Sequence, residues 1–319
     1  MTLPPSQPSA DRSIPALTLV PTAPAGFRSG FVALVGRPNV GKSTLLNGLV
    51  GQKIAITSPT AQTTRNRLQG VLTLPHAQMI WVDTPGIHKP HHRLGEVLVQ
   101  TARAAIQAVD VVALVADGSV PAGKGDRFIA NLISPETPVL LCRNKQDLIE
   151  GDRALLEASY RDLLPRAVQV SVSALQEKTL QPMLHAIADL LPIGPYYYPP
   201  DVVTDRPERF IMGELIREQV LHHTRDEVPH AVAIAVESVE ESEQLTRIRA
   251  TITVERASQK GIVIGKGGAM LKTIGSAARR QIQKLIAGKV YLELFVRVRP
   301  RWRQSQSLLE EFGYRVEKD

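Results

Sequence analysis

Cysteine is almost absent from this chain: Cys142 is the only one among 319 residues. A single thiol cannot form an intramolecular disulfide, and the sequence has no Cys/His cluster with the spacing of a zinc site. Cys142 ends the apolar run Val139–Cys142, which favours a small buried residue of a strand over a reactive thiol. We therefore expect a protein of a reducing, cytoplasmic compartment.

Long apolar runs are also lacking. No stretch approaches the roughly 18 to 20 consecutive apolar residues that cross a bilayer, and the N-terminus has no basic start followed by an apolar core. We expect a chain that is neither secreted nor membrane-spanning. Residues 1–28 contain six prolines together with Ser, Thr and Ala. Such a composition cannot form a core, so we expect a disordered tail there.

Acidic residues are scarce in one segment. Between Arg256 and Arg303 there are twelve Lys or Arg residues and a single acid, Glu293, which gives a local charge of +11, whereas the whole chain carries +7. Because the basic residues are concentrated rather than spread, they indicate a polyanionic partner.

The length suits two domains. From residue 29 onward, short apolar runs alternate with helical patterns, which predicts a mostly parallel sheet covered by helices on both faces. The helix Pro182–Leu191 should close this α/β domain, 29–192. The runs expected to be its strands are Phe31–Val35, Met79–Val82, Val109–Ala116, Val139–Cys142 and Val168–Val172.

The composition changes after this domain. Residues 193–204 are rich in Pro and Tyr and are expected to form a stiff linker. Residues 205–305 predict the order helix, strand, strand, helix, helix, strand, a smaller α+β domain, and 306–319 form a tail. The expected elements are a helix over 206–222 and strands over Ala231–Ser238, Leu245–Glu255 and Val290–Val298, with the polar stretch Val239–Glu243 as the hairpin connection.

The most specific motif is G-x-x-x-x-G-K-S, which directly follows the apolar run Phe31–Val35. In such a loop successive N–H groups face phosphate oxygens, the lysine (Lys42) spans the β- and γ-phosphates, and the hydroxyl (Ser43) ligates Mg²⁺. The helix that begins near Lys42 adds its N-terminal dipole. The predicted nucleotide contacts are Gly36, Arg37, Pro38, Asn39, Val40, Gly41, Lys42, Ser43 and Thr44.

Two further segments would complete the phosphate site. D-x-x-G ends the strand Met79–Val82, where Asp83 can hold Mg²⁺ through a water and the Gly86 N–H can meet the γ-phosphate. The predicted contacts there are Asp83, Thr84, Pro85, Gly86 and Ile87. A Ser/Thr-rich loop that includes Gln62–Arg65 should supply the last metal ligand, with Thr64 expected and Thr63 the alternative. The predicted metal ligands are Ser43, Thr64 and Asp83.

The motif N-K-x-D after the strand Val139–Cys142 selects the base. The Asp147 carboxylate can accept hydrogen bonds from guanine N1–H and its 2-amino group, which adenine does not offer, and Lys145 should lie along the base plane. After the strand Val168–Val172, a backbone N–H can reach guanine O6. The predicted base contacts are Asn144, Lys145, Asp147, Ser173, Ala174 and Leu175.

The residue after D-x-x-G is Ile87, not the glutamine that orients the attacking water in well-described GTPases. Hydrolysis should therefore follow another route and be slow. Asn39, in G-x-P-N-x-G-K-S, suggests a bound potassium ion in the role of an arginine finger. We predict Lys42, Thr64, Gly86 and Asn39 as catalytic residues.

His88, His91 and His92 resemble metal ligands, but we favour a solvated loop because no carboxylate or thiolate cluster accompanies them.

The basic segment contains G-K-G-G after Ile262–Ile264. A G-x-x-G loop between two helices lets a nucleic-acid backbone approach closely beside a groove for about four nucleotides. A plain helix-to-helix turn is the alternative, but the flanking strands and the charge favour a type II KH module. Trp302, Phe312 and Tyr314 either stack on bases or pack against the domain. The predicted RNA contacts are Ile264, Gly265, Lys266, Gly267, Gly268, Lys272, Arg279 and Arg280.

A P-loop GTPase domain joined through a Tyr-Pro linker to a KH domain resembles the Era family over roughly residues 29–305. The resemblance is carried by GRPNVGKS, QTTRN, DTPGIHKP, NKQD, SAL and VIGKGG. The SAL box departs from the acidic residue that often follows Ser-Ala. The resemblance implies GTP and GDP binding with Mg²⁺, GTP hydrolysis, binding of the 16S rRNA 3′ end, and a role in 30S ribosomal subunit assembly. It also implies a cytoplasmic protein with peripheral contact to the inner face of the cell membrane.

Two other functions stay open on the sequence. The basic face could bind anionic lipid in a membrane-surface switch, and the nucleotide fold could be catalytically silent in an RNA-binding scaffold.

Overall fold

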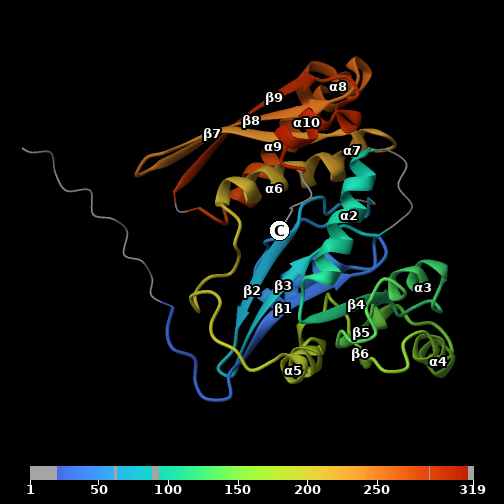
Figure 1. The fold of residues 1–319 in the computed structure, drawn as a ribbon. Coiled ribbons are helices and arrows are strands. Elements are labelled where there is room, and N and C mark those ends of the chain that lie inside the picture. The colour runs from blue at the N-terminus through green and yellow to red at the C-terminus, as the bar shows by residue number, and fades with distance from the viewer. Residues whose placement is uncertain (1–19, 61–62, 88–92, 287, 315–319) are drawn as a thin grey trace, which may run out of the picture.

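The computed structural model describes residues 20–60, 63–87, 93–286 and 288–314. It contains a larger and a smaller sheet, each with its own helices, and the two units lie against each other (Figure 1). Among the described residues, no helix combines the length and apolar character that crossing a membrane requires.

The larger sheet has the strand order β2-β3-β1-β4-β5-β6. The five strands expected from the apolar runs are parallel to one another. They are β1 (Arg28–Val35), β3 (Ala77–Asp83), β4 (Val111–Asp117), β5 (Val139–Asn144) and β6 (Val168–Ser171).

One strand, β2 (Leu68–Thr73), was not predicted from the sequence; it pairs antiparallel with β3. Its short sequence contains Gly70, which is unusual inside a strand. A Cβ at Gly70 would lie 2.8 Å from methyl groups of Ile54 and Leu46, so glycine permits close packing of α1 on this strand. The close packing against α1 explains why glycine, which disfavours a strand locally, stands at position 70.

Helices cover both faces of the larger sheet. One face packs against α1 (Lys42–Val50) and α5 (Gln181–Leu190). The other packs against α2 (Arg93–Gln107), and α3 (Lys124–Ala130) and α4 (Arg153–Leu163) lie on that same side. Two short 3₁₀ turns, η1 (Gln146–Leu148) and η2 (Glu177–Thr179), follow β5 and β6. The predicted α/β architecture, with a mostly parallel sheet, is confirmed.

The Pro- and Tyr-rich linker is held on the first domain. The rings of Tyr196 and Phe27 have centroids 4.4 Å apart, and those of Tyr197 and Phe31 are 5.2 Å apart. The Gln78 Oε1 atom accepts the backbone N–H of Tyr197 at 2.7 Å. Side-chain contacts, as well as proline, therefore fix the path of the linker.

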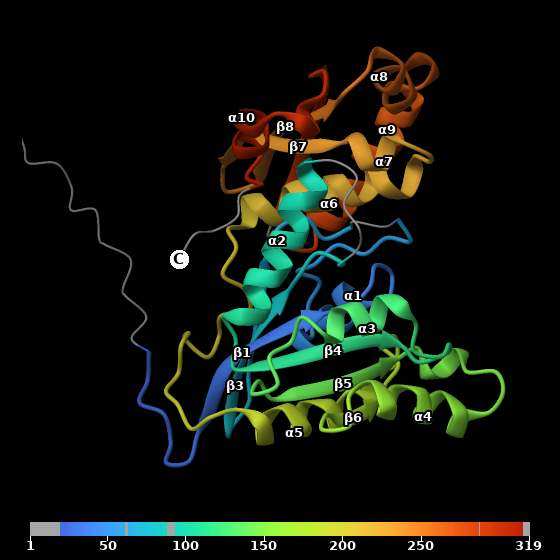
Figure 2. The same cartoon turned by 45° about the vertical axis from the view of Figure 1, so that its right-hand side comes forward.

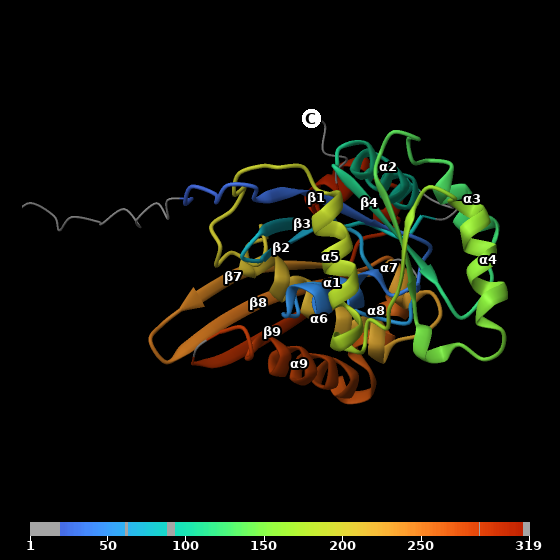
Figure 3. The same cartoon turned by 90° about the horizontal axis from the view of Figure 1, so that it is seen from below.

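The smaller sheet has the order β7-β8-β9, with β7–β8 antiparallel and β8–β9 parallel. The predicted α+β order is present, with one additional short helix, α7. The elements are α6 (Glu208–His223), α7 (Val228–Ala231), β7 (Ala233–Glu241), β8 (Leu245–Val254), α8 (Ala257–Ile264), η3 (Lys266–Gly268), α9 (Ala269–Ile282) and β9 (Lys289–Val298). Figure 3 shows α9 at the outer edge of the molecule, on the opposite side from α2.

The expected hairpin connection, Val239–Glu243, was wrong in its extent. Strand β7 continues to Glu241, so only the residues after it form the turn. Glu240 pairs with Arg247 in the ladder, where opposite charges on neighbouring strands favour pairing. Polar residues therefore extend the strand beyond the core instead of ending it.

The expected C-terminal tail contains structure in its described part. Helix α10 (Gln306–Glu311) of the tail and the turn η4 (Trp302–Gln304), which precedes the tail, pack with Tyr314 against Leu94 of α2. Trp302 is buried and donates its Nε1–H to the Ala231 carbonyl at 2.8 Å. The aromatic rings of this segment thus pack against the protein, which was one of the two alternatives. Figure 2 shows α10 beside the smaller sheet, above α2. Residues 1–19 and 315–319 lie outside the described residues. The expectation of a disordered tail over 1–28 was wrong at its end, because Phe27 is buried against Tyr196 and β1 begins at Arg28.

Candidate nucleotide site and nucleic-acid groove

The phosphate loop connects β1 to α1. Gly41, at φ 96°, is in the left-handed region, and a Cβ there would lie 2.4 Å from the Asn144 Nδ2 atom. Glycine is therefore required both by the backbone and by the neighbouring side chain. The cleft beside this loop is lined by Pro38, Asn39, Gly41, Lys42, Ser43, Thr44, Ile56, Thr57, Ser58, Thr63, Thr64 and Gly86.

Lys42 occupies the inside of the loop. Its Nζ atom donates to the carbonyls of Gly36 at 3.1 Å and Arg37 at 3.0 Å. Burial lowers the pKa of Lys42 to about 8, while the nearby Asp83 opposes this shift. A poorly hydrated ammonium in a loop of N–H donors is suited to a phosphate counter-ion.

The side chain of Arg37 is engaged outside the phosphate loop. Its side chain forms an ion pair with Asp126 of α3, with the Nε and Oδ1 atoms 2.8 Å apart. Only the backbone of Arg37 therefore faces the phosphate site.

Val40 is buried, and its carbonyl accepts the Asn144 Nδ2–H at 2.8 Å, so this residue supports the loop from the side of the base motif.

Three oxygen-bearing side chains meet where Mg²⁺ was predicted. The Ser43 and Thr64 hydroxyls lie 2.8 Å and 3.0 Å from the Asp83 Oδ2 atom, and 2.8 Å from each other. The other oxygen of Asp83, Oδ1, is buried and has no hydrogen-bond partner. Burial raises the pKa of Asp83, while Lys42 and the two hydroxyls oppose that shift.

This cluster fits Mg²⁺. The ion prefers oxygen ligands and usually binds one or two carboxylates together with substrate phosphates. The described residues contain no group of three His, Cys, Asp or Glu that could hold a metal by themselves. Thr63, the alternative to Thr64, donates its hydroxyl to the Thr60 carbonyl at 2.6 Å instead. His88, His91 and His92 lie outside the described residues.

The D-x-x-G segment packs on the phosphate loop. A Cβ on Gly86 would lie 2.9 Å from the Pro38 Cα atom, so only glycine permits this approach. Thr84 donates its hydroxyl to the Leu34 carbonyl at 2.8 Å, and the Ile87 N–H bonds the Gly36 carbonyl at 3.3 Å. Pro85 is buried, and the Ile87 side chain is in the core. Ile87 therefore does not offer a group that could orient water.

The base motifs are joined by Asn144. Its Oδ1 atom accepts the Ala174 N–H at 2.9 Å, and the Ser173 N–H bonds the Thr179 hydroxyl at 2.9 Å. The backbone N–H groups of Ser173 and Ala174 therefore already have partners inside the protein. The Leu175 N–H remains the candidate donor to guanine O6. Asp147 is exposed on η1, and the Leu175 side chain is 81% exposed.

Asp117 was missed by the sequence analysis. It ends β4 and accepts a hydrogen bond from the Lys145 Nζ atom at 2.7 Å. Partial burial would raise the pKa of Asp117, but the bonds from Lys145 and Ser119 outweigh it and lower that pKa. Asp117 therefore stays ionised and orients Lys145. The sequence did offer a signal for Asp117, because it is an acidic residue at the carboxyl end of a parallel strand, where ligands bind in such sheets.

The G-x-x-G loop borders a groove between α9 and the edge strand β9. The groove, of about 480 Å³, is lined by Gly268, Leu271, Lys272, Gly275, Ser276, Arg279, Tyr291, Leu292 and Leu294. Three predicted RNA contacts, Gly268, Lys272 and Arg279, thus line it. Ile264 is the last residue of α8, Gly265, Lys266 and Gly267 form the adjoining loop, and Arg280 is exposed on α9 outside the lining.

Gly265 in the adjoining loop and Tyr291 on β9 shape the surroundings of this groove. Gly265, at φ 72°, must be glycine because a Cβ would lie 2.8 Å from the Met270 backbone nitrogen. Tyr291, which the sequence analysis did not select, is 47% exposed, and the Arg247 guanidinium lies 5.7 Å from its ring centroid. An exposed aromatic ring beside a groove with cationic side chains can stack on a nucleobase.

Comparisons with known proteins agree with this architecture. Residues 31–145 match a family described as 50S ribosome-binding GTPase, and residues 227–303 match the KH domain family. The chain is 63% identical over 303 residues to GTPase Era of Nostoc sp. strain PCC 7120, covering 94% of this chain and 93% of that protein. It is 60% identical over 306 residues to GTPase Era of Rippkaea orientalis, covering 95% and 97%.

Solved structures give the same result. The chain is similar to Era crystallised with MgGDPNP and nucleotides 1506–1542 of 16S ribosomal RNA, with TM-score 0.86 and 37% identity over 91% of this chain and 99% of that one. It is also similar to an Aquifex aeolicus Era variant bound to GDP·AlF₄⁻, with TM-score 0.86 and 36% identity over 91% and 100%. The chain belongs to the Era family of GTPases.

Proposed function

We propose that this GTPase binds the 3′ end of 16S rRNA through its KH domain and acts in 30S ribosomal subunit assembly from the cytoplasm. One observation carries the proposal: a relative whose structure matches 91% of this chain holds a magnesium nucleotide and a 16S rRNA segment together. We assign the nucleotide to the phosphate loop and the RNA to the groove beside α9, because the first holds the predicted phosphate and Mg²⁺ ligands and the second is lined by Lys272 and Arg279.

In this proposal the nucleotide residues have separate roles. Lys42 and the backbone of the phosphate loop bind the β- and γ-phosphates, and Ser43, Thr64 and Asp83 hold Mg²⁺. A bound Mg²⁺ would neutralise charge on the phosphate oxygens. The Gly86 N–H senses the γ-phosphate, and Asp147 selects guanine. The assignments of Lys42, Ser43, Thr64 and Asp83 rest on the distances given above, and those of Gly86 and Asp147 rest on the D-x-x-G and N-K-x-D motifs.

Hydrolysis has to proceed without a water-orienting side chain at Ile87. We propose that Asn39 helps to hold a potassium ion that supplies positive charge near the γ-phosphate. Asn39 is in the left-handed region, at φ 64°, and its Nδ2 atom bonds the Pro59 carbonyl at 2.9 Å, so the residue connects the two loops that border the phosphates.

Potassium should therefore stimulate turnover. Phosphate release in KCl should exceed that in NaCl by about tenfold or more, because a fixed charge at the transferring phosphate stabilises the transition state. The Asn39→Ala variant should lose the difference. Equal rates in the two salts would contradict the role of potassium, and no phosphate release with RNA and ribosomal subunits present would favour the silent scaffold.

Nucleotide state should change RNA affinity. Binding of a labelled RNA with the sequence of the 16S 3′ end is measured by fluorescence anisotropy with a GTP analogue and with GDP. We expect about tenfold tighter binding with the analogue, within the usual range of coupling between two sites. Identical affinities would contradict the coupling between the nucleotide and KH domains.

The membrane part of the proposal is tested on the same samples. Contact with the inner face of the cell membrane would use the basic residues of the KH domain, so the protein should float with anionic liposomes at low salt. Flotation without RNA binding would favour a lipid-surface switch over an rRNA-binding GTPase. RNA binding without flotation would remove the membrane contact from the proposal.

A further inference from the structure

The KH domain holds the loop that carries Thr64. Arg217, on α6, is fully buried, and its Nη2 atom donates to the Thr63 carbonyl, 154 residues away in the sequence. The same guanidinium is oriented by Glu214, whose Oε1 atom accepts the Nε–H at 2.9 Å. The residue directly before the expected Mg²⁺ ligand is thus bound by a side chain of the other domain.

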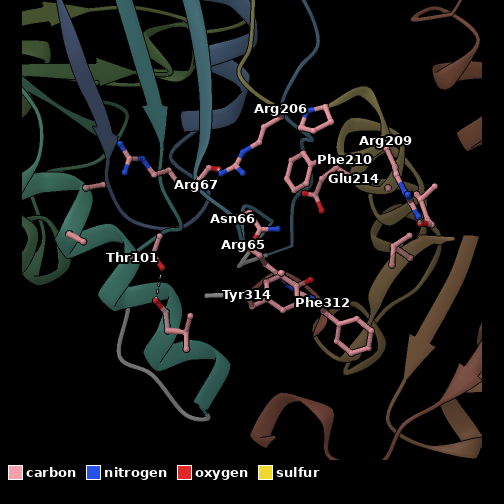
Figure 4. Close-up of a pocket in the computed structure, with 18 of the residues that line it drawn as sticks. Arg65, Asn66, Arg67, Thr101, Arg206, Arg209, Phe210, Glu214, Phe312 and Tyr314 are labelled. Carbon is pink, nitrogen blue, oxygen red and sulfur yellow. Dashed lines mark hydrogen bonds between the residues drawn. The ribbon is translucent and has the colours of Figure 1, made fainter. Parts of the chain in front are cut away.

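Arg65, directly after Thr64, makes the reciprocal contact. Its guanidinium is buried in the KH domain, where it donates to the Pro229 carbonyl at 3.0 Å and the Val232 carbonyl at 2.5 Å. Its Cζ atom lies 6.0 Å from the centroid of the Tyr314 ring, and Figure 4 shows the two side chains together. Thr64 is therefore bracketed by two arginines that cross the domain junction in opposite directions.

A third contact holds the start of the same loop. The Glu218 carboxylate of α6 accepts the Thr57 N–H at 2.8 Å and the Lys53 ammonium at 2.7 Å. The His222 Nε2 atom lies 3.0 Å from the Thr57 carbonyl oxygen. Helix α6 thus contacts this loop near its start, at Thr57, and near its end, at Thr63.

Packing alone does not hold the two domains together here. A cavity of about 630 Å³ lies beside the junction, and Arg65, Phe210, Glu214 and Tyr314 contribute to its walls (Figure 4). The hydrogen bonds of the arginines give the loop a directional attachment to the KH domain, which adds to the apolar cluster that contains Ile54 and Ile56 with residues of α6. Such bonds carry much of the specificity when a charged group is buried.

We infer that Arg217 is a positioning residue for GTP hydrolysis. By holding the Thr63 carbonyl, it keeps the Thr64 hydroxyl 3.0 Å from Asp83 and 2.8 Å from Ser43, where Thr64 can ligate Mg²⁺. Its guanidinium is buried and bonded to a carbonyl and a carboxylate, so it acts through Thr64 rather than on the phosphate. This inference rests on the proposed GTPase site and adds a contribution from the KH domain.

The test uses the full chain with Arg217→Gln. Thr64 is needed only when a γ-phosphate is present, so GDP affinity should stay within about twofold of the unmodified protein, whereas affinity for a GTP analogue and single-turnover hydrolysis should fall about tenfold. The Mg²⁺ concentration required for half-maximal binding of the analogue should rise. A purely structural role would weaken GDP and the analogue equally.

The matched control is Arg209→Gln. Arg209 is on the same helix, but its guanidinium donates to β7 carbonyls of its own domain. It should leave the Mg²⁺ dependence unchanged.

The outcomes separate the inference from the function on which it rests. An unmodified protein that fails to hydrolyse GTP would overturn the proposed function itself. Hydrolysis in the unmodified protein, with an unchanged ratio of GDP to analogue affinity in Arg217→Gln, would overturn the positioning role alone. If that variant does not fold, Glu214→Gln, which keeps the guanidinium but removes its orienting charge, gives the same comparison. An unchanged ratio there would also refute the role.

Discussion

Replacing Asp147 with asparagine is expected to lower GTP affinity by about 10³-fold or more and to create a preference for xanthosine triphosphate. The asparagine amide keeps one acceptor, which can still face guanine N1–H, but it presents donors where the second carboxylate oxygen accepted from the 2-amino group. That amino group therefore loses its partner and faces another donor. Xanthine carries a carbonyl in place of that amino group and can accept from the amide. Titration calorimetry with both nucleotides and with ATP measures the change.

The control for this prediction is Glu150→Gln. Glu150 is an exposed acid three residues further along the chain, so its replacement removes the same charge without removing a base contact. It should bind GTP as the unmodified protein does. Equal affinity of the unmodified protein for ATP and GTP, or an unaltered GTP affinity in Asp147→Asn, would contradict the role of this carboxylate.

Changing the interior of the G-x-x-G loop should abolish most RNA binding. The double replacement Lys266→Asp and Gly267→Asp puts two negative charges where a phosphate backbone is expected, and affinity at low salt should fall about 100-fold. Gly267 is in the left-handed region, at φ 59°, and a Cβ there would meet nothing within 4 Å. Aspartate tolerates this conformation better than most residues, so the domain should still fold.

The measurement is a salt titration of RNA affinity. The slope of log affinity against log salt should become shallower by about 0.7 for each phosphate contact that is lost. The control is Lys178→Asp, an exposed residue of η2 in the nucleotide domain. GTP-analogue affinity should be the same in all three proteins. RNA binding that survives the double replacement would place the interface elsewhere on the KH domain.

The contiguous motifs could be interpreted without coordinates for a physical reason. The phosphate loop and the G-x-x-G loop are built from neighbouring residues, and the glycines in them satisfy local backbone requirements such as those of Gly41 and Gly265. The parallel strands are buried on both faces, so each stands out as an apolar run. Fold class, order of elements and most candidate site residues follow from such local signals.

Contacts between distant residues could not be predicted in this way. β2 becomes a strand because β3 pairs with it and α1 packs on Gly70, and the segment after residue 305 is structured because α2 offers an apolar face. Asp117 orients Lys145 across neighbouring strands. These features need the tertiary arrangement, since no local pattern of residues encodes the partner.

By itself, the amino-acid sequence determined a guanine-nucleotide domain followed by a KH domain, because the chemistry of phosphate and base recognition resides in short runs of backbone and side chains. Only the tertiary structure decided which hydroxyl faces Asp83 and how the KH domain holds the loop that carries it. Arg217 and Thr63 are 154 residues apart, and their contact exists only after both domains have folded and docked.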